Sequence, residues 1–263
     1  MKPITPLQPD HAAVTAASIL SARRKSGEQG PRLPKSCRPA DLDAALAIQA
    51  AVTAQLGERI AAWKCGVPAA GRMVLAPIYA GTVHNDSNAR CALWVRAGQA
   101  RVEPELAFVL GRDLPVRESP YTPAEVDAAI ARTHLALELI DSRYGDAAEL
   151  SFADNLADGL LNQGLFIDPE VDGAAARAAS AMPLSISCAT GAASQLTGRH
   201  PNDDPRAPLY WLAEYLRSTG RGLQAGQAVI TGSYAGCIDL PLEQEIAIRY
   251  GELGTLTVRF TQK

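Results

Sequence analysis

The chain has 263 residues, enough for one large domain or for a domain with a small appendage. It is 47% hydrophobic and 20% charged, which is typical of globular proteins, and its net charge of −3 gives no basic field for binding a nucleic acid. Five scattered cysteines without metal-ligand spacing favour reduced thiols and a cytoplasmic location. Residues 1–14 hold no apolar signal core, and no apolar run is long enough to span a membrane.

Two helices are predicted at the start of the chain. Residues 11–27 and 40–57 place apolar side chains at roughly helical spacing, and the second stretch stops at Gly57. The loop between them, residues 27–39, is rich in glycine and proline. We therefore expect a small helical region ahead of a larger body.

The rest of the chain combines predicted strands with two predicted helices. Apolar runs and period-two alternation indicate strands at residues 60–67, 91–98, 101–111, 134–143 and 227–236, and a hairpin at 245–260. A helix is expected after the capping box of Thr122 and Glu125, and another over residues 206–222. Residues 144–205 are expected to be mostly loop. This pattern predicts an α+β fold with antiparallel or mixed strands, and not a doubly wound sheet.

Two acids interrupt the apolar strand predicted at residues 101–111. Glu103 and Glu105 are two positions apart, so their side chains leave the same face of a strand, with Cα atoms about 6.5 Å apart. Neighbouring buried carboxylates repel each other unless they share a proton or hold a divalent cation. A third acid on another strand, Glu138, favours the cation, and an all-oxygen ligand set suits Mg²⁺ or Mn²⁺. The alternative is that both acids line the solvent-exposed face of an edge strand. Pro104 is consistent with this alternative, because proline within sheets occurs mainly in edge strands and at bulges.

Five motifs occur in an order that resembles the fumarylacetoacetate hydrolase superfamily, and within it the branch of 2-keto-4-pentenoate hydratases and 4-oxalocrotonate decarboxylases. The resemblance extends from about Ala61 to Phe260, and the five motifs are RVEPELAFVLGRDLP, ALELIDSRY, FADNLADG, VITGSYAG and GELGTLTVRF. An E-x-E pair alone is common. Followed by E-x-x-D-S-R and then by T-G-S near the C-terminus, it is specific.

The resemblance implies a mixed β-roll, with a helical N-terminal region at residues 1–72 and a catalytic domain at residues 73–263. It also implies that Glu103, Glu105 and Glu138 bind Mg²⁺ or Mn²⁺. These three residues are therefore the candidate metal ligands.

The resemblance gives three further candidate site residues. The family lysine falls on Lys64 of AAWKCGV; the alternative is a lysine that reaches solvent from a strand end. Arg143 would bind a substrate carboxylate through two hydrogen bonds, or would only pair with an acid near the strand end. Thr231 lies in a turn that is near the substrate in the family.

The resemblance implies a lyase of aromatic catabolism, acting on a small 2-hydroxy-dienoic or 2-oxo-enoic acid through a metal-stabilised enolate. A hydratase is the first reading. A 4-oxalocrotonate-type decarboxylase is the alternative, because APIYAG and SRY resemble that branch and an acid expected of hydratases is replaced around Ile78 and Tyr79. An acylpyruvate C–C hydrolase and a non-catalytic assembly partner are further alternatives. A homo-oligomer built from dimers is expected, and a sister pathway enzyme is a candidate partner.

Overall fold

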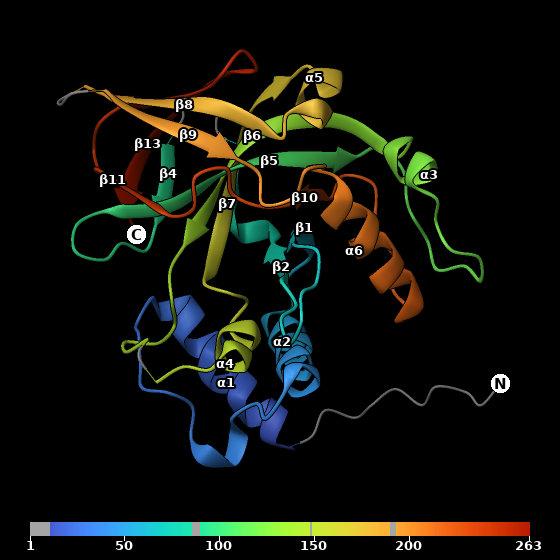
Figure 1. Cartoon of the computed structure of the whole chain (residues 1–263). Coiled ribbons are helices and arrows are strands. Elements are labelled where there is room, and N and C mark those ends of the chain that lie inside the picture. Colours follow the sequence, from blue (N-terminus) through green and yellow to red (C-terminus); the bar gives the residue numbers. More distant parts are fainter. Residues whose placement is uncertain (1–10, 86–89, 148, 190–192) are drawn as a thin grey trace.

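A β-rich body and a smaller lobe of helices make up the chain, as Figure 1 shows. The computed structural model describes residues 11–85, 90–147, 149–189 and 193–263, so most of the N-terminal stretch that was searched for a signal core lies outside the described residues. The predicted α+β class, a mixed β-roll with a helical N-terminal region, is confirmed. No helix among the described residues has both the length and the apolar composition needed to cross a lipid bilayer.

The helical lobe contains α1 (His11–Ser26), α2 (Leu42–Leu56) and α4 (Phe152–Ala157). Asp41 begins α2, because its carboxylate accepts the Ala44 N–H at 2.8 Å. Gly57 ends α2 with a left-handed φ of 66°, a conformation that glycine adopts without a steric penalty. The helices share one buried apolar cluster, which includes Ala16, Leu20, Ala45, Ile48 and Leu156. Both predicted N-terminal helices are thus confirmed.

The larger sheet of the body is mixed, in the order β2-β1-β10-β5-β6-β7-β3, with β11 also paired to β5. Its strands are β1 (Ile60–Cys65), β2 (Leu75–Tyr79), β3 (Val83–His84), β5 (Ala100–Leu110), β6 (Ile130–Ile140), β7 (Asn162–Val171), β10 (Ala228–Ile230) and β11 (Ile238–Leu240). The smaller sheet has the order β4-β13-β12-β8-β9. Its strands are β4 (Arg90–Leu93), β8 (Ala181–Cys188), β9 (Ser194–Arg199), β12 (Ile246–Tyr250) and β13 (Gly254–Gln262).

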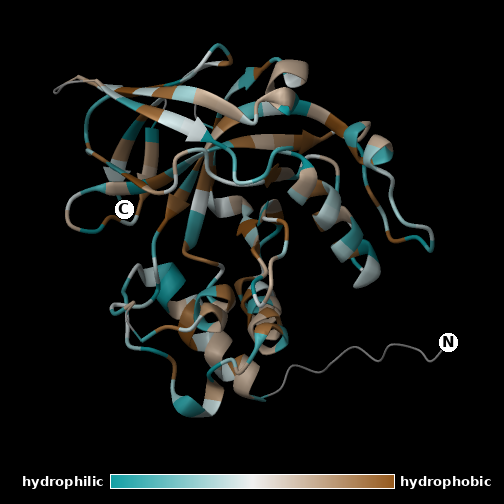
Figure 2. Ribbon diagram, viewed as in Figure 1, coloured by the Kyte–Doolittle hydropathy of each residue, from teal (hydrophilic) through white to brown (hydrophobic). Residues whose placement is uncertain are grey.

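The two faces of β5 have different surroundings. Figure 2 shows hydrophobic residues along β5 and β6. Val102, Leu106 and Phe108 join a core cluster that also contains residues of β12 and β13. Because side chains alternate along a strand, the odd-numbered residues of β5, which include Glu103 and Glu105, project to the other face.

The body also carries α3 (Pro123–Asp127), α5 (Gly173–Ala178), α6 (Ala207–Ser218) and the 3₁₀ turn η2 (Ala80–Thr82). The other 3₁₀ turn, η1 (Lys35–Cys37), packs against α1 in the helical lobe. The capping box predicted before α3 is present, with Thr122 N–H donating to Glu125 Oε2 at 2.8 Å. The C-terminal hairpin is also confirmed, since Ile246 pairs with Val258 in antiparallel register.

The prediction that residues 144–205 are mostly loop is wrong. This stretch holds α4, α5, β7, β8 and β9. β7 escapes recognition because it opens with Asn162 and Gln163 and contains Pro169, residues that strands generally avoid or confine to their ends. β8 does alternate buried Met182 and Leu184 with other residues, but alanine-rich sequence precedes it and hides the signal.

The boundary between the two predicted regions falls between β1 and β2. Strand β1 pairs in parallel with β10 and antiparallel with β2, so it belongs to the larger sheet. The helical lobe, in turn, includes α4 from the middle of the chain. The division into residues 1–72 and 73–263 stays a prediction.

Candidate metal centre

The three predicted metal ligands lie next to one another on two central strands. Glu103 on β5 is directly opposite Glu138 on β6, and Glu105 follows two positions further along β5. Glu105 is 2% exposed, Glu138 is 0% exposed, and Glu103 is half-buried. Because β5 has β6 on one side and β10 and β11 on the other, the alternative of a wet edge strand is wrong.

Pro104 fits into this central strand because the pairing beside it is interrupted. β10 pairs with residues 107–109 of β5, and β11 pairs with residues 100–102. In the interval, the carbonyl of Pro104 accepts the N–H of Tyr234 at 2.9 Å. Since the N–H and C=O of one strand residue point to the same side, the missing N–H of the proline faces this loop and not β6. The interruption brings the loop of residues 231–237 up to the acids.

The geometry of the three acids fits a divalent cation. Each offers an oxygen atom, and these atoms all lie within 4.8 Å of one another. Oxygens on one Mg²⁺ are at most about 4.2 Å apart, so a small inward movement of the side chains completes the cluster. Glu138 Oε2 is buried and has no hydrogen-bond partner among the described residues, a costly state that a cation would relieve. Carboxylate oxygens are the donors that Mg²⁺ and Mn²⁺ prefer.

Lys64 reaches Glu138, although β10 and β5 separate their strands in the sheet. Its Nζ atom lies 2.6 Å from Glu138 Oε1 and donates to the carbonyl of Leu160 at 3.1 Å. The lysine side chain is 10% exposed, so the alternative of an ammonium group that reaches solvent at a strand end does not describe it. Its predicted catalytic role stays a prediction.

The charges in this cluster shift one another's pKa values. Burial, followed by Glu138 and Glu103, raises the pKa of Glu105 well above its usual value. Burial also raises the pKa of Glu138, although Lys64 acts against that shift. Burial lowers the pKa of Lys64, but Glu138 and Glu103 outweigh it, and the net shift is upward. The metal-free centre therefore favours a protonated carboxyl beside a charged lysine.

The raised pKa of Glu105 predicts a pH-dependent stability for the metal-free protein. An unfolded glutamate loses its proton near pH 4.3, but the folded protein keeps this proton to higher pH, so the folded state binds more protons in that window. The contribution of Glu105 to stability therefore falls as the pH rises. The test compares the melting temperatures of Glu105→Gln and the unsubstituted protein in buffer with EDTA. The value for the variant minus the value for the unsubstituted protein should increase as the pH is raised from 5 to 8. A difference that stays constant over this range would contradict the prediction.

Two contacts to the acids come from the loop of residues 231–237, and the sequence analysis identified neither. Gly232 N–H donates to Glu105 Oε2 at 2.7 Å, and Cys237 Sγ lies 3.0 Å from Glu103 Oε1. A Cβ atom at position 232 would lie 2.6 Å from Pro201 Cγ, and the φ of 141° is a conformation that glycine alone adopts readily. The T-G-S motif pointed to the hydroxyl side chains on either side, whereas the glycine backbone makes the contact.

The other two predicted catalytic residues have partners away from the acids. Thr231 is buried, and its hydroxyl lies 3.4 Å from Nε2 of His200, so its catalytic role stays a prediction. Arg143 is also buried, and its Nε donates to Asp158 Oδ1 at 2.6 Å. This ion pair matches the alternative stated for Arg143, in which it only pairs with an acid near the strand end. An arginine held in this way is not free to bind a substrate carboxylate, and we leave it out of the proposed catalytic set.

A cavity of about 290 Å³ begins one row of side chains beyond the acids. Arg101 precedes Glu103 by two positions on β5, and Ile140 follows Glu138 by two positions on β6, so both lie on the same face as the acids and line the cavity. The side chain of Leu161 adds another apolar group to the wall. The cavity is therefore suited to the part of a substrate that extends away from the ion.

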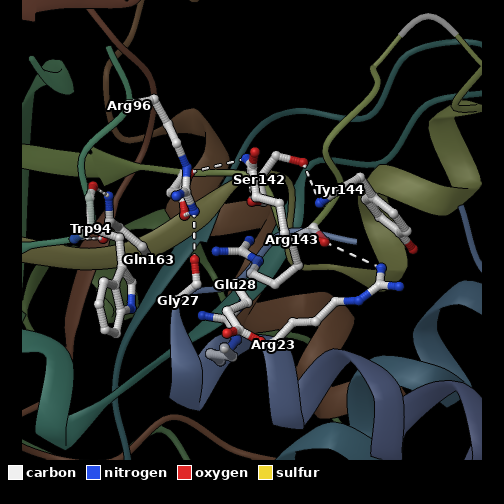
Figure 3. Close-up of polar contacts among 12 residues, drawn as sticks. Arg23, Gly27, Glu28, Trp94, Arg96, Ser142, Arg143, Tyr144 and Gln163 are labelled. Atoms are coloured by element: carbon white, nitrogen blue, oxygen red, sulfur yellow. Dashed lines mark hydrogen bonds and ion pairs between the residues drawn. The ribbon is translucent and has the colours of Figure 1, made fainter. Parts of the chain in front are cut away.

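Hydrogen bonds at one wall of this cavity join the body to the helical lobe. Figure 3 shows the contact between Arg96 and Gly27 among them. Arg96 donates to the carbonyl of Gly27 at 2.8 Å and forms an ion pair with Asp141 at 2.7 Å. The other arginine that lines the cavity, Arg101, lies at the end nearer the acids and pairs with Asp239 at 2.8 Å. Both arginines that line the cavity already have an acid partner.

Known proteins with similar sequences are hydratases and a decarboxylase, although no model of a protein family matches the chain. The chain is 27% identical to 2-keto-4-pentenoate hydratase 2 of Dechloromonas aromatica (strain RCB), over 95% of this chain and 97% of the relative. It is 28% identical to a 4-oxalocrotonate decarboxylase of a Pseudomonas species, over 64% of this chain and 67% of the relative.

The fold is similar to that of 4-oxalocrotonate decarboxylase from Pseudomonas putida G7, a structure solved with magnesium and adipate. The TM-score is 0.76 at 16% identity, over 95% of this chain and 97% of the other. Another protein with a similar fold is named for the fumarylacetoacetate hydrolase family. The predicted resemblance to the fumarylacetoacetate hydrolase superfamily, in its hydratase and decarboxylase branch, is confirmed.

The relatives with similar sequences indicate a lyase-type enzyme. Hydratases add water to a double bond and decarboxylases release CO₂, and both kinds of enzyme occur among the proteins that the chain matches along most of its length. The prediction of a lyase-type enzyme in the hydratase and decarboxylase branch is confirmed.

Proposed function

We propose that this protein is a divalent-metal-dependent hydratase of a small 2-hydroxy-dienoic acid, the tautomer of a 2-oxo-enoic acid. The observation that carries the proposal is the buried cluster of Glu103, Glu105 and Glu138, with the ammonium of Lys64 2.6 Å from Glu138. The three acids would hold Mg²⁺ or Mn²⁺, which as a Lewis acid supplies charge stabilisation at the C1 carboxylate and C2 oxygen of the substrate. The similarity to a fold solved with magnesium supports this choice.

Each protein group around the ion has a separate task in this proposal. The acids carry three negative charges, and a divalent ion balances two of them. Lys64 balances the third, which allows an anionic substrate to approach, and its Nζ atom can hold a proton for transfer to the substrate. Gly232 N–H fixes one oxygen of Glu105 and leaves the other for the ion. Water addition moves electrons toward the C2 oxygen of the substrate, where the positive charges are concentrated.

The charges of the cavity favour hydration over decarboxylation of the 4-oxalocrotonate type. That second substrate is a dicarboxylate, which would carry a second negative group away from the ion. Among the described residues that line the cavity, Arg96 and Arg101 are already paired with Asp141 and Asp239. A monocarboxylic dienoic acid needs no further cation. Decarboxylation stays the second candidate, because a decarboxylase is among the relatives and APIYAG and SRY resemble that branch.

Product analysis tests the proposal and its alternative together. Purified protein with Mn²⁺ and 2-hydroxypenta-2,4-dienoate should form 4-hydroxy-2-oxopentanoate, detected by NMR, and EDTA should stop the reaction. The same protein with 4-oxalocrotonate should release no CO₂ above the rate of the buffer. CO₂ release without hydration would select the decarboxylase, and inertness toward both substrates in the presence of Mn²⁺ would contradict both.

The state of assembly is a separate expectation that comes from the family resemblance. A homo-oligomer built from dimers, and a complex with a sister pathway enzyme, stay predictions. The proposed chemistry requires neither, because all of the groups named above come from one chain.

A further inference from the structure

One short turn contacts both members of the ion pair at the proposed metal centre. It comprises Gly159, Leu160, Leu161 and Asn162, directly before and at the start of β7. The carbonyl of Leu160 accepts a hydrogen bond from Lys64 Nζ at 3.1 Å. Asn162 Nδ2 donates to Glu138 Oε1 at 2.9 Å and also to the carbonyl of Gly164 at 3.1 Å. The turn therefore determines where the ammonium and the carboxylate meet.

The backbone of this turn is strained. Three consecutive residues have left-handed φ values, namely 80° at Gly159, 53° at Leu160 and 65° at Leu161. Leucine rarely adopts such values, because its Cβ atom then crowds the backbone carbonyl. Leu161 is 36% exposed, so deep burial of its own side chain does not account for the strain. Local backbone hydrogen bonds, such as Leu160 N–H to the carbonyl of Asn155 at 2.7 Å, hold the turn together with contacts from other segments. Strain held in this way is typical of functional sites.

Two hydrogen bonds to this turn come from the helical lobe. Arg24 on α1 donates from Nη2 to the carbonyl of Asp158 at 2.9 Å and from Nη1 to the carbonyl of Asn162 at 3.0 Å. Its guanidinium thus bridges the two ends of the turn. Burial, followed by Arg143, lowers the pKa of Arg24 to about 10, which still leaves it charged at neutral pH. On the other side, Asp141 N–H donates to the carbonyl of Leu161 at 2.8 Å.

We infer that Asn162 and Arg24 are positioning residues of the metal centre. Arg24 keeps the turn in its left-handed conformation, and the turn then orients Glu138 through the amide of Asn162 and Lys64 through the carbonyl of Leu160. The helical lobe is accordingly part of the machinery of the site and not an appendage to it. This inference rests on the proposed function, since it assumes that Glu138 binds the ion.

Mn²⁺ affinity, measured by EPR or calorimetry well below the melting temperature, tests the inference without relying on activity. Asn162→Ala and Arg24→Met should each raise the Kd for Mn²⁺ about ten- to a hundredfold, the range typical for groups that orient metal ligands. Arg24→Lys keeps the charge but only one point of contact, so its Kd should lie between those of Arg24→Met and the unsubstituted protein.

Arg32→Met is the matched control. Arg32 forms an ion pair with Asp154 of α4 at 2.7 Å, within the helical lobe, and this pair does not involve the turn. Its Kd should stay within about twofold of the unsubstituted value, even where its melting temperature falls as far as that of Arg24→Met.

Failure of the inference and failure of the proposed function give different results. If the unsubstituted protein does not bind Mn²⁺, the metal-dependent function is wrong. If it binds Mn²⁺ and Glu138→Gln loses the ion, but Asn162→Ala and Arg24→Lys bind with unchanged Kd, the positioning role is overturned and the metal site stands. The last two variants carry the test if Arg24→Met does not fold.

Discussion

Replacing Glu138 with glutamine should lower kcat/KM about a thousandfold, equivalent to about 4 kcal/mol, because the ion that stabilises charge on the substrate is lost or displaced. Glu138 lies at the centre of the cluster, opposite Glu103 and paired with Lys64. Glutamine has the same shape, and its amide oxygen can still accept hydrogen bonds from Lys64 and Asn162. The substitution therefore removes a charge and one metal ligand while it keeps the packing. Steady-state kinetics with saturating Mn²⁺ measure the effect.

Measuring Mn²⁺ binding by Glu138→Gln shows whether Glu138 is a metal ligand or only lies near the metal site. The Kd of Glu138→Gln for Mn²⁺ should rise at least about a hundredfold, beyond what the loss of an orienting group produces. Glu118→Gln is the control, since Glu118 is an exposed acid outside the cluster, and it should keep both activity and affinity. Full activity in Glu138→Gln, or equal losses in both variants, would show that the cluster is not the metal site.

Local pattern singled out the acids as a group, and the family resemblance was needed to choose a metal site over the solvated face of an edge strand. The period of two along a strand puts Glu103 and Glu105 on one face whatever the rest of the fold does. A third acid in the next predicted strand, Glu138, then needs only the register in which it lies opposite Glu103. The capping box of α3 and the glycine stop of α2 are local in the same sense, and both were predictable.

The groups that hold the acids in place were not predictable, because each acts over a long separation in sequence. Gly232 contacts an acid 127 positions away, and Asn162 contacts one 24 positions away. Asn162 has no charge or motif that marks it as part of a site, and the T-G-S motif that contains Gly232 gives no sign that the glycine N–H makes the contact. The partner of Arg143 could not be chosen from sequence either, since a substrate carboxylate and Asp158 are equally suitable for a guanidinium.

The strained turn at residues 159–162 was not predicted from the sequence, for a related reason. Leucines at positions 160 and 161 give no signal for left-handed backbone, which sequence reasoning expects at glycine or asparagine. Strand β7, which follows the turn, was missed as well, so the connection between the turn and the acids could not be seen. The local preference of the residues is overridden here by contacts from α1, and such conflicts concentrate at functional sites.

Replacing Lys64 with methionine should destabilise the metal-free protein by about 3–5 kcal/mol, because it removes the positive partner of a buried carboxylate. Lys64 is 8% exposed, and Glu138 and Glu105 are nearly inaccessible to water, so solvent does little to screen the acids that are left. Mn²⁺ replaces the missing charge and should raise the melting temperature of Lys64→Met more than that of the unsubstituted protein. Thermal unfolding with Mn²⁺ and with EDTA measures both effects.

The direction of the pH dependence gives this prediction a second test. The pKa values of Glu105 and Glu138 are already raised in the folded protein, and loss of Lys64 raises them further, since Lys64 opposes both shifts. The folded state of Lys64→Met then binds more protons than the unfolded chain above about pH 4.3, so its stability falls as the pH rises. Protons at low pH, or Mn²⁺ at neutral pH, should each restore stability. Lys25→Met, a substitution at an exposed lysine of α1, should show neither response. If Lys64→Met is as stable as the Lys25 control in EDTA at pH 8, the three acids do not form a charged cluster that depends on Lys64.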